Sequence, residues 1–166
     1  RQMCIRDSPD AKRDQVGPDA ISAFTSLNLS RSEPEQTRRL ALADWIASPD
    51  NTLTARVLVN RLWQFHFGNG IVGTPSDFGM NGMTPTHPQL LDWLAVEFVE
   101  NDWDMKHIVR LLVTSSVYRQ ASVSREELNE VDAGNRMYAR QSRFRVDAEM
   151  VRDAALRISG LLLVQN

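Results

Sequence analysis

Apolar residues recur at helical spacing in several segments of the chain, and no segment shows the alternation of apolar and polar residues that is typical of a strand. This pattern predicts an all-α fold. We expect an irregular helical bundle of about five main helices, with a long glycine-rich connection between the second and the third. The expected helices cover about residues 33–48, 53–67, 87–98, 104–115 and 147–163, with a short helix near 125–130.

Polar residues and glycines mark the ends of these helices. Ser32 and Glu35 have the spacing of a capping box, which predicts that the first helix starts after Ser32. Thr86 and Asp104 are expected to cap the third and fourth helices. Gly68 is expected to end the second helix, because glycine adopts the left-handed conformation that often follows a helix without a steric cost.

The apolar positions of each helix define the face that we expect to be buried. Such a face is predicted in the first helix at Leu40, Ala43, Ile46 and Ala47, in the third at Leu90, Leu91, Leu94, Ala95 and Phe98, and in the last at Met150, Val151, Ala154, Ile158 and Leu161. The four tryptophans, Trp45, Trp63, Trp93 and Trp103, are expected to belong to the core. A chain of 166 residues is long enough to bury such a core.

Charge and cysteine content exclude several classes of function. A net charge of −2 and a pI near 5.9 give no basic field for nucleic acid or anionic lipid. The single cysteine, Cys4, allows no internal disulfide, no zinc knuckle and no haem attachment motif. No apolar run reaches the roughly 18 residues of a membrane span. We therefore expect no metal and no cofactor in this chain, no nucleic-acid partner and no membrane span.

Composition divides the chain into three parts. Residues 1–8 lack periodicity and are expected to be linker or assembly-derived sequence. Residues 9–33 are polar and are expected to form an extended lead-in. Residues 34–166 are expected to form the helical domain. Its last apolar pattern stops without a capping residue, so we expect this domain to be truncated at its C-terminus.

The second helix carries Asn60 and Arg61 among apolar neighbours. A buried charge without a partner is very costly, so this pair is expected either to face a groove or to be buried with partners. In the first case the planar guanidinium of Arg61 would recognise a carboxylate or phosphate. In the second, which the sequence favours, Arg61 would pair with Asp77 or Asp92 in a structural network.

His66, Asp77 and His87 are the candidates for catalysis. Two histidines and a carboxylate could serve as acid and base or hold a metal. Their spacing matches no short catalytic or metal-binding motif, and the chain has no HExxH, GxSxG, GxxxxGK[ST] or GxGxxG sequence. The sequence therefore favours structural roles for them.

A group of basic residues precedes the last helix: Arg136, Arg140, Arg143 and Arg145. Such a group could bind an anion. Asp147, Glu149, Arg152 and Asp153 follow closely, and the proximity of these acids favours internal salt bridges. Too few aromatic residues accompany the arginines for a nucleic-acid stacking platform.

Five strings follow one another along the chain: RRLALADWIASPDN, LTARVLVNRLWQFHFGNGIVGTPSDFG, PTHPQLLDWLAVEFVENDW, HIVRLLVTSSVYRQAS and VDAEMVRDAALRISG. Together they resemble the planctomycete-type PSD domain, domain of unknown function 1553, over about residues 38–162. Thr52 stands where that family tends to have Pro, and Val146 stands where it tends to have Leu.

This resemblance implies a large exported protein, located in the periplasm, the cell envelope or outside the cell, in which the domain lies beside other domains. It implies a c-type cytochrome or polysaccharide context, and any haem would belong to a neighbouring domain. Our leading hypothesis is a structural or interaction module whose partners are adjacent domains of the same polypeptide, with polysaccharide as a further partner. The alternative is an enzyme acting on a glycan or sulfated polymer, with Arg61, His66, Asp77 and His87 in one pocket.

Overall fold

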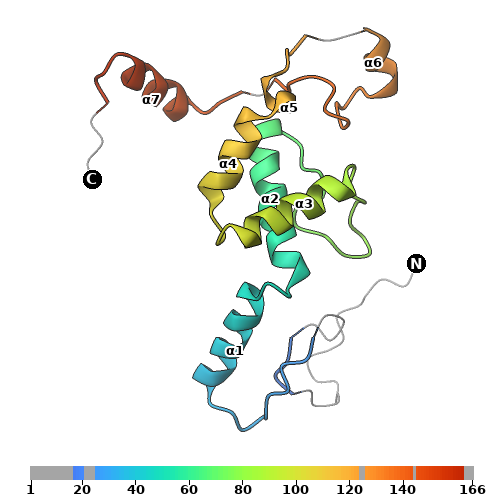
Figure 1. Ribbon diagram of the computed structural model, residues 1–166, viewed down its shortest axis with the longest axis vertical. Helices are drawn as coiled ribbons and strands as arrows, with labels where there is room; N and C mark the ends of the chain where they lie inside the picture. Colours follow the sequence, from blue (N-terminus) through green and yellow to red (C-terminus); the bar gives the residue numbers. More distant parts are fainter. Residues whose placement is uncertain (1–16, 21–24, 124–125, 144, 163–166) are drawn as a thin grey trace, which may run out of the picture. The chain divides into compact units, whose positions relative to one another are not determined.

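The computed structural model describes residues 17–20, 25–123, 126–143 and 145–162. These residues contain helices and no strand, which confirms the all-α prediction. The helices are α1 (Glu35–Ala47), α2 (Thr52–Phe67), α3 (Pro88–Glu100), α4 (Met105–Thr114), α5 (Ser116–Arg119), α6 (Glu126–Val131) and α7 (Ala148–Ile158) (Figure 1). Residues 1–8 lie outside the described residues.

The chain divides into two compact units, Arg1–Thr54 and Ala55–Asn166. In the first unit, α1 starts at Glu35 after Pro34, with no side chain capping it, so the predicted capping box at Ser32 is wrong. The Ser32 hydroxyl is hydrogen-bonded to the Ser30 hydroxyl instead. Asn51 marks the start of α2, because its side-chain oxygen accepts hydrogen bonds from the backbone N–H groups of Leu53 and Thr54.

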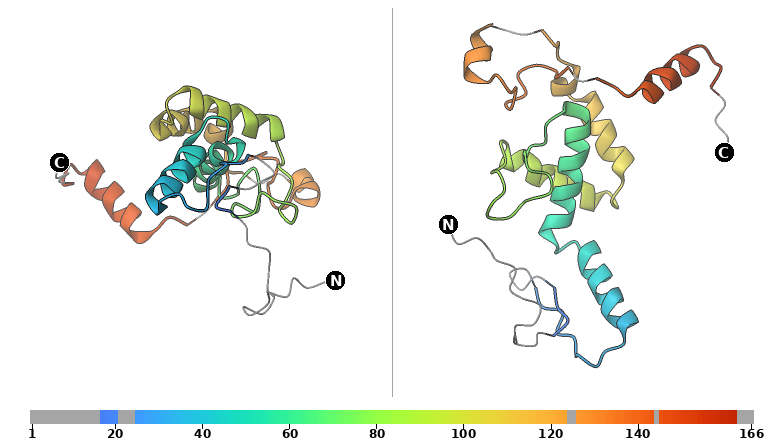
Figure 2. Two further views of the ribbon diagram at one scale, coloured as in Figure 1. Left: turned by 90° about the horizontal axis from the view of Figure 1, so that it is seen from below. Right: turned by 180° about the vertical axis from the view of Figure 1, so that it is seen from behind.

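The core of the second unit is built on α2. In Figure 1, α3 crosses α2 and α4 runs alongside it, and the reverse view in Figure 2 shows the same arrangement. These three helices supply most of the buried side chains: Ala55, Val59, Trp63, Phe67, Leu91, Leu94, Ala95, Phe98, Ile108 and Leu112. Ile71 and Val72 from the loop after α2, and Tyr138 from a later segment, complete this core.

The ends of α2 and α4 follow the sequence prediction. Gly68 follows α2 with a φ of 84°, in the left-handed region that glycine tolerates best. The Asp104 side chain accepts a hydrogen bond from the Lys106 backbone N–H and caps α4. The predicted cap of α3 is wrong, since Thr86 lies before the N-cap residue and its hydroxyl donates to the Ile71 carbonyl oxygen at 3.2 Å.

The loop between α2 and α3 is closed at its base. The Thr86 backbone N–H donates to the Ile71 carbonyl oxygen at 2.9 Å, so the two ends of the intervening segment meet. Inside it, the Thr74 hydroxyl donates to the Asp77 carbonyl oxygen and accepts from the Met83 N–H. The glycine-rich connection is thus a shaped Ω-type loop rather than an open linker.

The prediction that α7 buries an apolar face is wrong for the described residues. Ile158 is 88% exposed, and Met150, Val151 and Leu161 are all more than half exposed. The apolar spacing is present, but no α7 residue belongs to the core or packs against it. Periodicity determines which face of a helix is apolar, whereas burial also needs a partner surface.

Two expectations about other apolar side chains also need correction. Trp63 is buried at 4% exposure and Trp103 packs against the core, but Trp93 in α3 is 51% exposed and Trp45 lies in α1, which has no buried residue. In α1, Leu40 and Ile46 are exposed as well, so the predicted buried stripe of that helix is wrong for the described structure. Both helices keep the predicted helical conformation.

Candidate functional site

Asn60 is the most completely buried polar residue of α2. Its side-chain oxygen accepts a hydrogen bond from the Val72 N–H at 2.8 Å, and its amide nitrogen donates to the Val72 carbonyl oxygen at 3.1 Å. Asn60 is 0% exposed, so its amide is used inside the protein. A Cβ on Gly70 would lie 2.6 Å from the Val72 oxygen and 2.9 Å from both amide atoms of Asn60. Gly70 is therefore required for this close approach.

Arg61 lies beside Asn60 in the sequence but is exposed. The two acids proposed as its partners are engaged elsewhere. The Arg56 Nε donates to Asp92 Oδ1 at 2.7 Å, and Asp77 Oδ1 accepts the Gly79 N–H at 2.9 Å. The predicted Arg61 network is thus wrong, because successive helical positions point in different directions and Arg56, not Arg61, faces α3. A binding role for Asn60 and Arg61 stays a prediction from the sequence.

The catalytic candidates each have separate neighbours. The His66 Nδ1 lies 2.7 Å from the Leu62 carbonyl oxygen, one turn earlier in α2, and its ring meets the edge of Tyr118. The His87 Nδ1 lies 2.9 Å from the Thr86 hydroxyl. Among the described residues, no hydrogen bond, ion pair or ring contact joins His66, Asp77 and His87 to one another.

The part of the chain that the structure describes contains no cluster of three or more His, Cys, Asp or Glu side chains that could hold a metal ion. It also contains no helix long and apolar enough to cross a bilayer.

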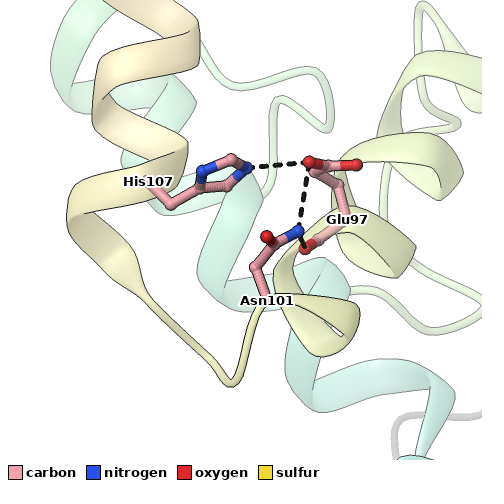
Figure 3. Close-up of polar contacts among 3 residues, drawn as sticks. All are labelled: Glu97, Asn101 and His107. Atoms are coloured by element: carbon pink, nitrogen blue, oxygen red, sulfur yellow. Dashed lines mark hydrogen bonds and ion pairs between the residues drawn. The ribbon is translucent and has the colours of Figure 1, made fainter.

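His107 forms a polar contact that the sequence analysis did not single out. Its Nε2 lies 2.8 Å from Glu97 Oε1, and the Asn101 side-chain nitrogen donates to the Glu97 carbonyl oxygen at 2.8 Å and to Oε1 at 3.1 Å (Figure 3). Figure 3 shows His107 on α4 reaching across to the end of α3. A histidine ten residues after a glutamate matches no sequence motif. The two side chains meet only because the turn between α3 and α4 brings the helices together.

This contact closes a strained turn. Asp102 and Trp103 have φ values of 55° and 59°, in the left-handed region that residues with a Cβ rarely adopt. The Trp103 N–H donates to the Phe98 carbonyl oxygen, and the Trp103 ring meets the Phe98 ring edge to face at 5.2 Å. A carboxylate that orients an imidazole could support proton transfer. Together with the hydrogen bond and the ring contact between Trp103 and Phe98, the His107–Glu97 contact holds the end of α3 against α4.

Tyr138 links a later segment to α2 through aromatic contacts. Its ring meets the edges of Trp63 at 5.1 Å and Phe67 at 5.7 Å, and its hydroxyl donates to the Asn69 carbonyl oxygen at 3.3 Å. Burial raises the pKa of the Tyr138 phenol above its usual value. The segment around Tyr138 is thereby fixed next to the start of the glycine-rich loop.

A cavity of about 470 Å³ lies where this segment meets the end of α2. Its lining residues are Gly68, Asn69, Ser122, Val123, Ala133, Gly134, Asn135, Arg140, Gln141, Ser142 and Arg143. Arg140 and Arg143 belong to the basic group seen in the sequence, and the structure places them in one pocket. Three separate stretches of chain build the wall, and sequence spacing does not show that they meet.

The salt bridges expected between these four arginines and the acids that follow are absent from the described residues, where Asp153 pairs with Arg152 at 3.7 Å instead. Neither Arg140 nor Arg143 is paired with an acid there. The nearby Asp132 is occupied by the backbone, since its carboxylate accepts the N–H groups of Arg136 and Met137 at 2.8 Å each.

One comparison with known proteins identifies the family. A family model described as "Protein of unknown function (DUF1553)", PSD1, matches residues 38–165. The match covers most of the chain, and the chain belongs to this family. Searches among curated proteins and among solved structures found no match.

Proposed function

We propose that this DUF1553 chain is a structural and interaction module, and that α7 docks against an adjacent domain of the same polypeptide. One observation carries the proposal: α7 exposes an apolar stripe made of Met150, Val151, Ala154, Ile158 and, beyond its end, Leu161. We call these five residues the α7 stripe. Contiguous exposed apolar surface of this kind marks interaction sites in soluble proteins.

The other face of α7 supports the same function. Glu149, Arg152, Asp153 and Arg157 are charged and exposed there. A helix with one apolar and one charged face is suited to laying its apolar face into a groove of a partner. Burying one large aliphatic side chain contributes about 1.5–3 kcal/mol, so a few stripe residues are enough for a specific contact.

The proposal extends to the setting of the module. The family resemblance points to exported multidomain proteins of planctomycetes, in the periplasm, envelope or extracellular space. In such a protein the adjacent domain would be the natural partner of α7, and a c-type cytochrome or polysaccharide-processing activity would belong to the larger chain. A Cys-x-x-Cys-His sequence in a neighbouring domain of the same gene would support the cytochrome context.

The enzyme alternative requires His66, Asp77, His87 and Arg61 to converge. His66 is bound within α2, His87 is bound to the neighbouring Thr86, and Asp77 is bound within its own loop. No observation on the described residues favours a shared catalytic pocket for them, so the module is the better supported function.

The decisive experiment mixes the purified chain with the adjacent domains encoded by the same gene, and measures complex formation by titration calorimetry. We expect Met150→Ser combined with Ile158→Ser to weaken the complex at least about tenfold, because it removes two apolar contacts. The matched control is Glu149→Ser combined with Arg157→Ser, which alters the charged face and, like the first pair, leaves the net charge unchanged.

Two results would contradict the proposal. The first is a complex that the stripe variant and the control variant weaken equally. The second is a homodimer that forms through α7 in the absence of the adjacent domains, measured by analytical ultracentrifugation.

A further inference from the structure

The cavity at the end of α2 has the composition of a ligand site rather than of a packing defect. Its volume of about 470 Å³ falls within the range typical of small-molecule pockets. Its wall combines two guanidinium groups with side-chain amides and hydroxyls. No acidic residue is among the described residues that line it. This cavity is open to solvent, and its polar lining suits a polar ligand that can replace the water there.

The two arginines leave most of their donors unused within the described structure. The Arg143 Nε donates weakly to the Ser122 hydroxyl at 3.4 Å, and no hydrogen bond or ion pair is recorded for the Arg140 guanidinium. Each guanidinium presents a planar set of donors that matches two oxygens of a carboxylate or sulfate. Two of them in one wall favour an oxyanion.

Gln141 adds an orphaned polar atom to the same wall. Its backbone N–H donates to the Ala121 carbonyl oxygen, whereas its side-chain Oε1 is buried and has no hydrogen-bond partner in the described structure. A buried acceptor without a donor is costly. The Gln141 side chain would have to turn toward the cavity for a ligand hydroxyl to reach this oxygen.

The wall is held rigidly before any ligand arrives. Asn135 is buried, its amide nitrogen donates to the Arg140 carbonyl oxygen at 2.8 Å, and its side-chain oxygen accepts the Arg140 N–H at 3.3 Å. Asn135 and Tyr138 both have left-handed φ values, 50° and 54°. Tyr138 is anchored in the core, so the segment that carries Arg140 keeps this conformation. Preorganisation of this kind lowers the entropic cost of binding.

We infer that this cavity is a binding site for a small, hydroxyl-rich molecule that carries one oxyanion, such as a sugar acid or a sugar sulfate. The arginines bind the oxyanion, and the side chains of Asn69, Ser122 and Ser142 bind the hydroxyl groups. The inference uses residues remote in sequence from the α7 stripe, so it goes beyond the proposed docking function and does not depend on it.

The test titrates the full chain with sodium glucuronate, glucose 6-sulfate and glucose, and follows binding by saturation-transfer NMR and calorimetry. We expect both anionic sugars to bind, and neutral glucose to bind at least about tenfold more weakly. The ratio of the two anionic affinities distinguishes a carboxylate from a sulfate ester as the preferred group. Inorganic sulfate alone is expected to bind more weakly than glucose 6-sulfate, because it lacks the hydroxyl contacts.

The variant Arg140→Gln combined with Arg143→Gln is expected to abolish the preference for the anionic sugars. Arg145→Gln combined with Arg119→Gln is the matched control, since both residues are exposed and neither lines the cavity. Circular dichroism checks that each variant is folded. Equal loss in test and control variants, equal affinity for glucose and glucuronate, or no binding of either anionic sugar would overturn the inference.

Discussion

The packed helices α2–α4 and helix α7 have similar sequence patterns but opposite surroundings. In α3 the predicted apolar positions Leu91, Leu94 and Phe98 are at most 2% exposed, whereas Ile158 in α7 is 88% exposed. Both segments are helical as expected. The difference is that α3 meets α2 and α4, while the α7 stripe meets no core residue. An amphipathic pattern therefore predicts a helix and its apolar face, and only the fold shows whether that face is already occupied.

Among the substitutions that test this difference between the core and α7, the largest loss of stability is expected at the centre of the core. Trp63→Ala is expected to lower the free energy of unfolding by about 3–5 kcal/mol, because a large buried ring is lost and leaves a cavity. Trp63 stacks on Phe67 at 4.1 Å. Urea unfolding measures the change, and the exposed Trp93→Ala is the control. An unchanged melt for Trp63→Ala would show that this ring is not part of the core.

The second largest loss of stability is expected at the polar contact between Asn60 and Val72 in the same core. Asn60→Ala is expected to cost about 2–4 kcal/mol, because it leaves the buried N–H and carbonyl of Val72 unpaired. Gly70→Ala should destabilise the protein through the same place, and the double variant should cost less than the sum of the two single ones. Gln64→Ala, on the same helix, is the control. Strict additivity would contradict the proposed coupling.

A smaller loss of stability is expected at the His107–Glu97 contact between α3 and α4. His107→Ala should cost about 0.5–1 kcal/mol, since the His107–Glu97 contact is partly exposed and screened by solvent. A double-mutant cycle with Glu97→Ala measures the pairwise coupling. Zero coupling would mean that the Phe98–Trp103 contact alone holds the turn.

The contribution of Tyr138 to the stability of the core is expected to depend on pH. Tyr138→Phe is expected to cost only about 0.5 kcal/mol at neutral pH, because the lost hydrogen bond to Asn69 is long. The folded pKa of Tyr138 is raised, so the folded state holds its proton at higher pH than the unfolded state does. This contribution is fully present below the unfolded pKa of about 10 and is lost as the pH rises through the folded pKa.

Unfolding curves measured between neutral and strongly alkaline pH check this sign. The wild type should lose stability above pH of about 10 more steeply than Tyr138→Phe does. Identical slopes for the wild type and Tyr138→Phe would show that the buried phenol does not contribute.

The smallest effect is expected in α7. Ile158→Ala should change the stability of the isolated chain by less than about 0.5 kcal/mol, because its side chain is exposed there. If α7 docks as proposed, the same substitution should weaken the complex with an adjacent domain. A loss of more than about 2 kcal/mol in the isolated chain would show that the α7 stripe packs within its own domain, and the contrast with the core would disappear.

Two of the helix ends that depend on local chemistry were predicted from the sequence, whereas the Ser32 capping box was not formed. The Gly68 terminus and the Asp104 cap were confirmed because each needs only the residues next to it. The Thr86 cap was wrong because Thr86 bonds Ile71, fifteen residues earlier in the sequence. A tertiary hydrogen bond had replaced the local one.

The candidate site was harder to predict than the fold. The roles proposed for His66, Asp77 and His87 were based on residue type, and these side chains have separate local partners. The cavity with Arg140 and Arg143 depends on a buried turn around Asn135, which no sequence spacing reveals. Sites formed by irregular loops depend on long-range contacts, so periodicity carries no information about them.

The closed base of the loop between α2 and α3 has a consequence for how this domain can vary. Ile71 and Thr86 are bonded, and Asn60 holds Val72, so the tip near Met80 can change without disturbing the helices. Met80 is fully exposed there. Lengthening a loop whose ends are already held together costs little, because the entropic penalty grows only with the logarithm of its length. The exposed position at Met80 is therefore one at which a grafted peptide or an inserted domain is expected to be tolerated.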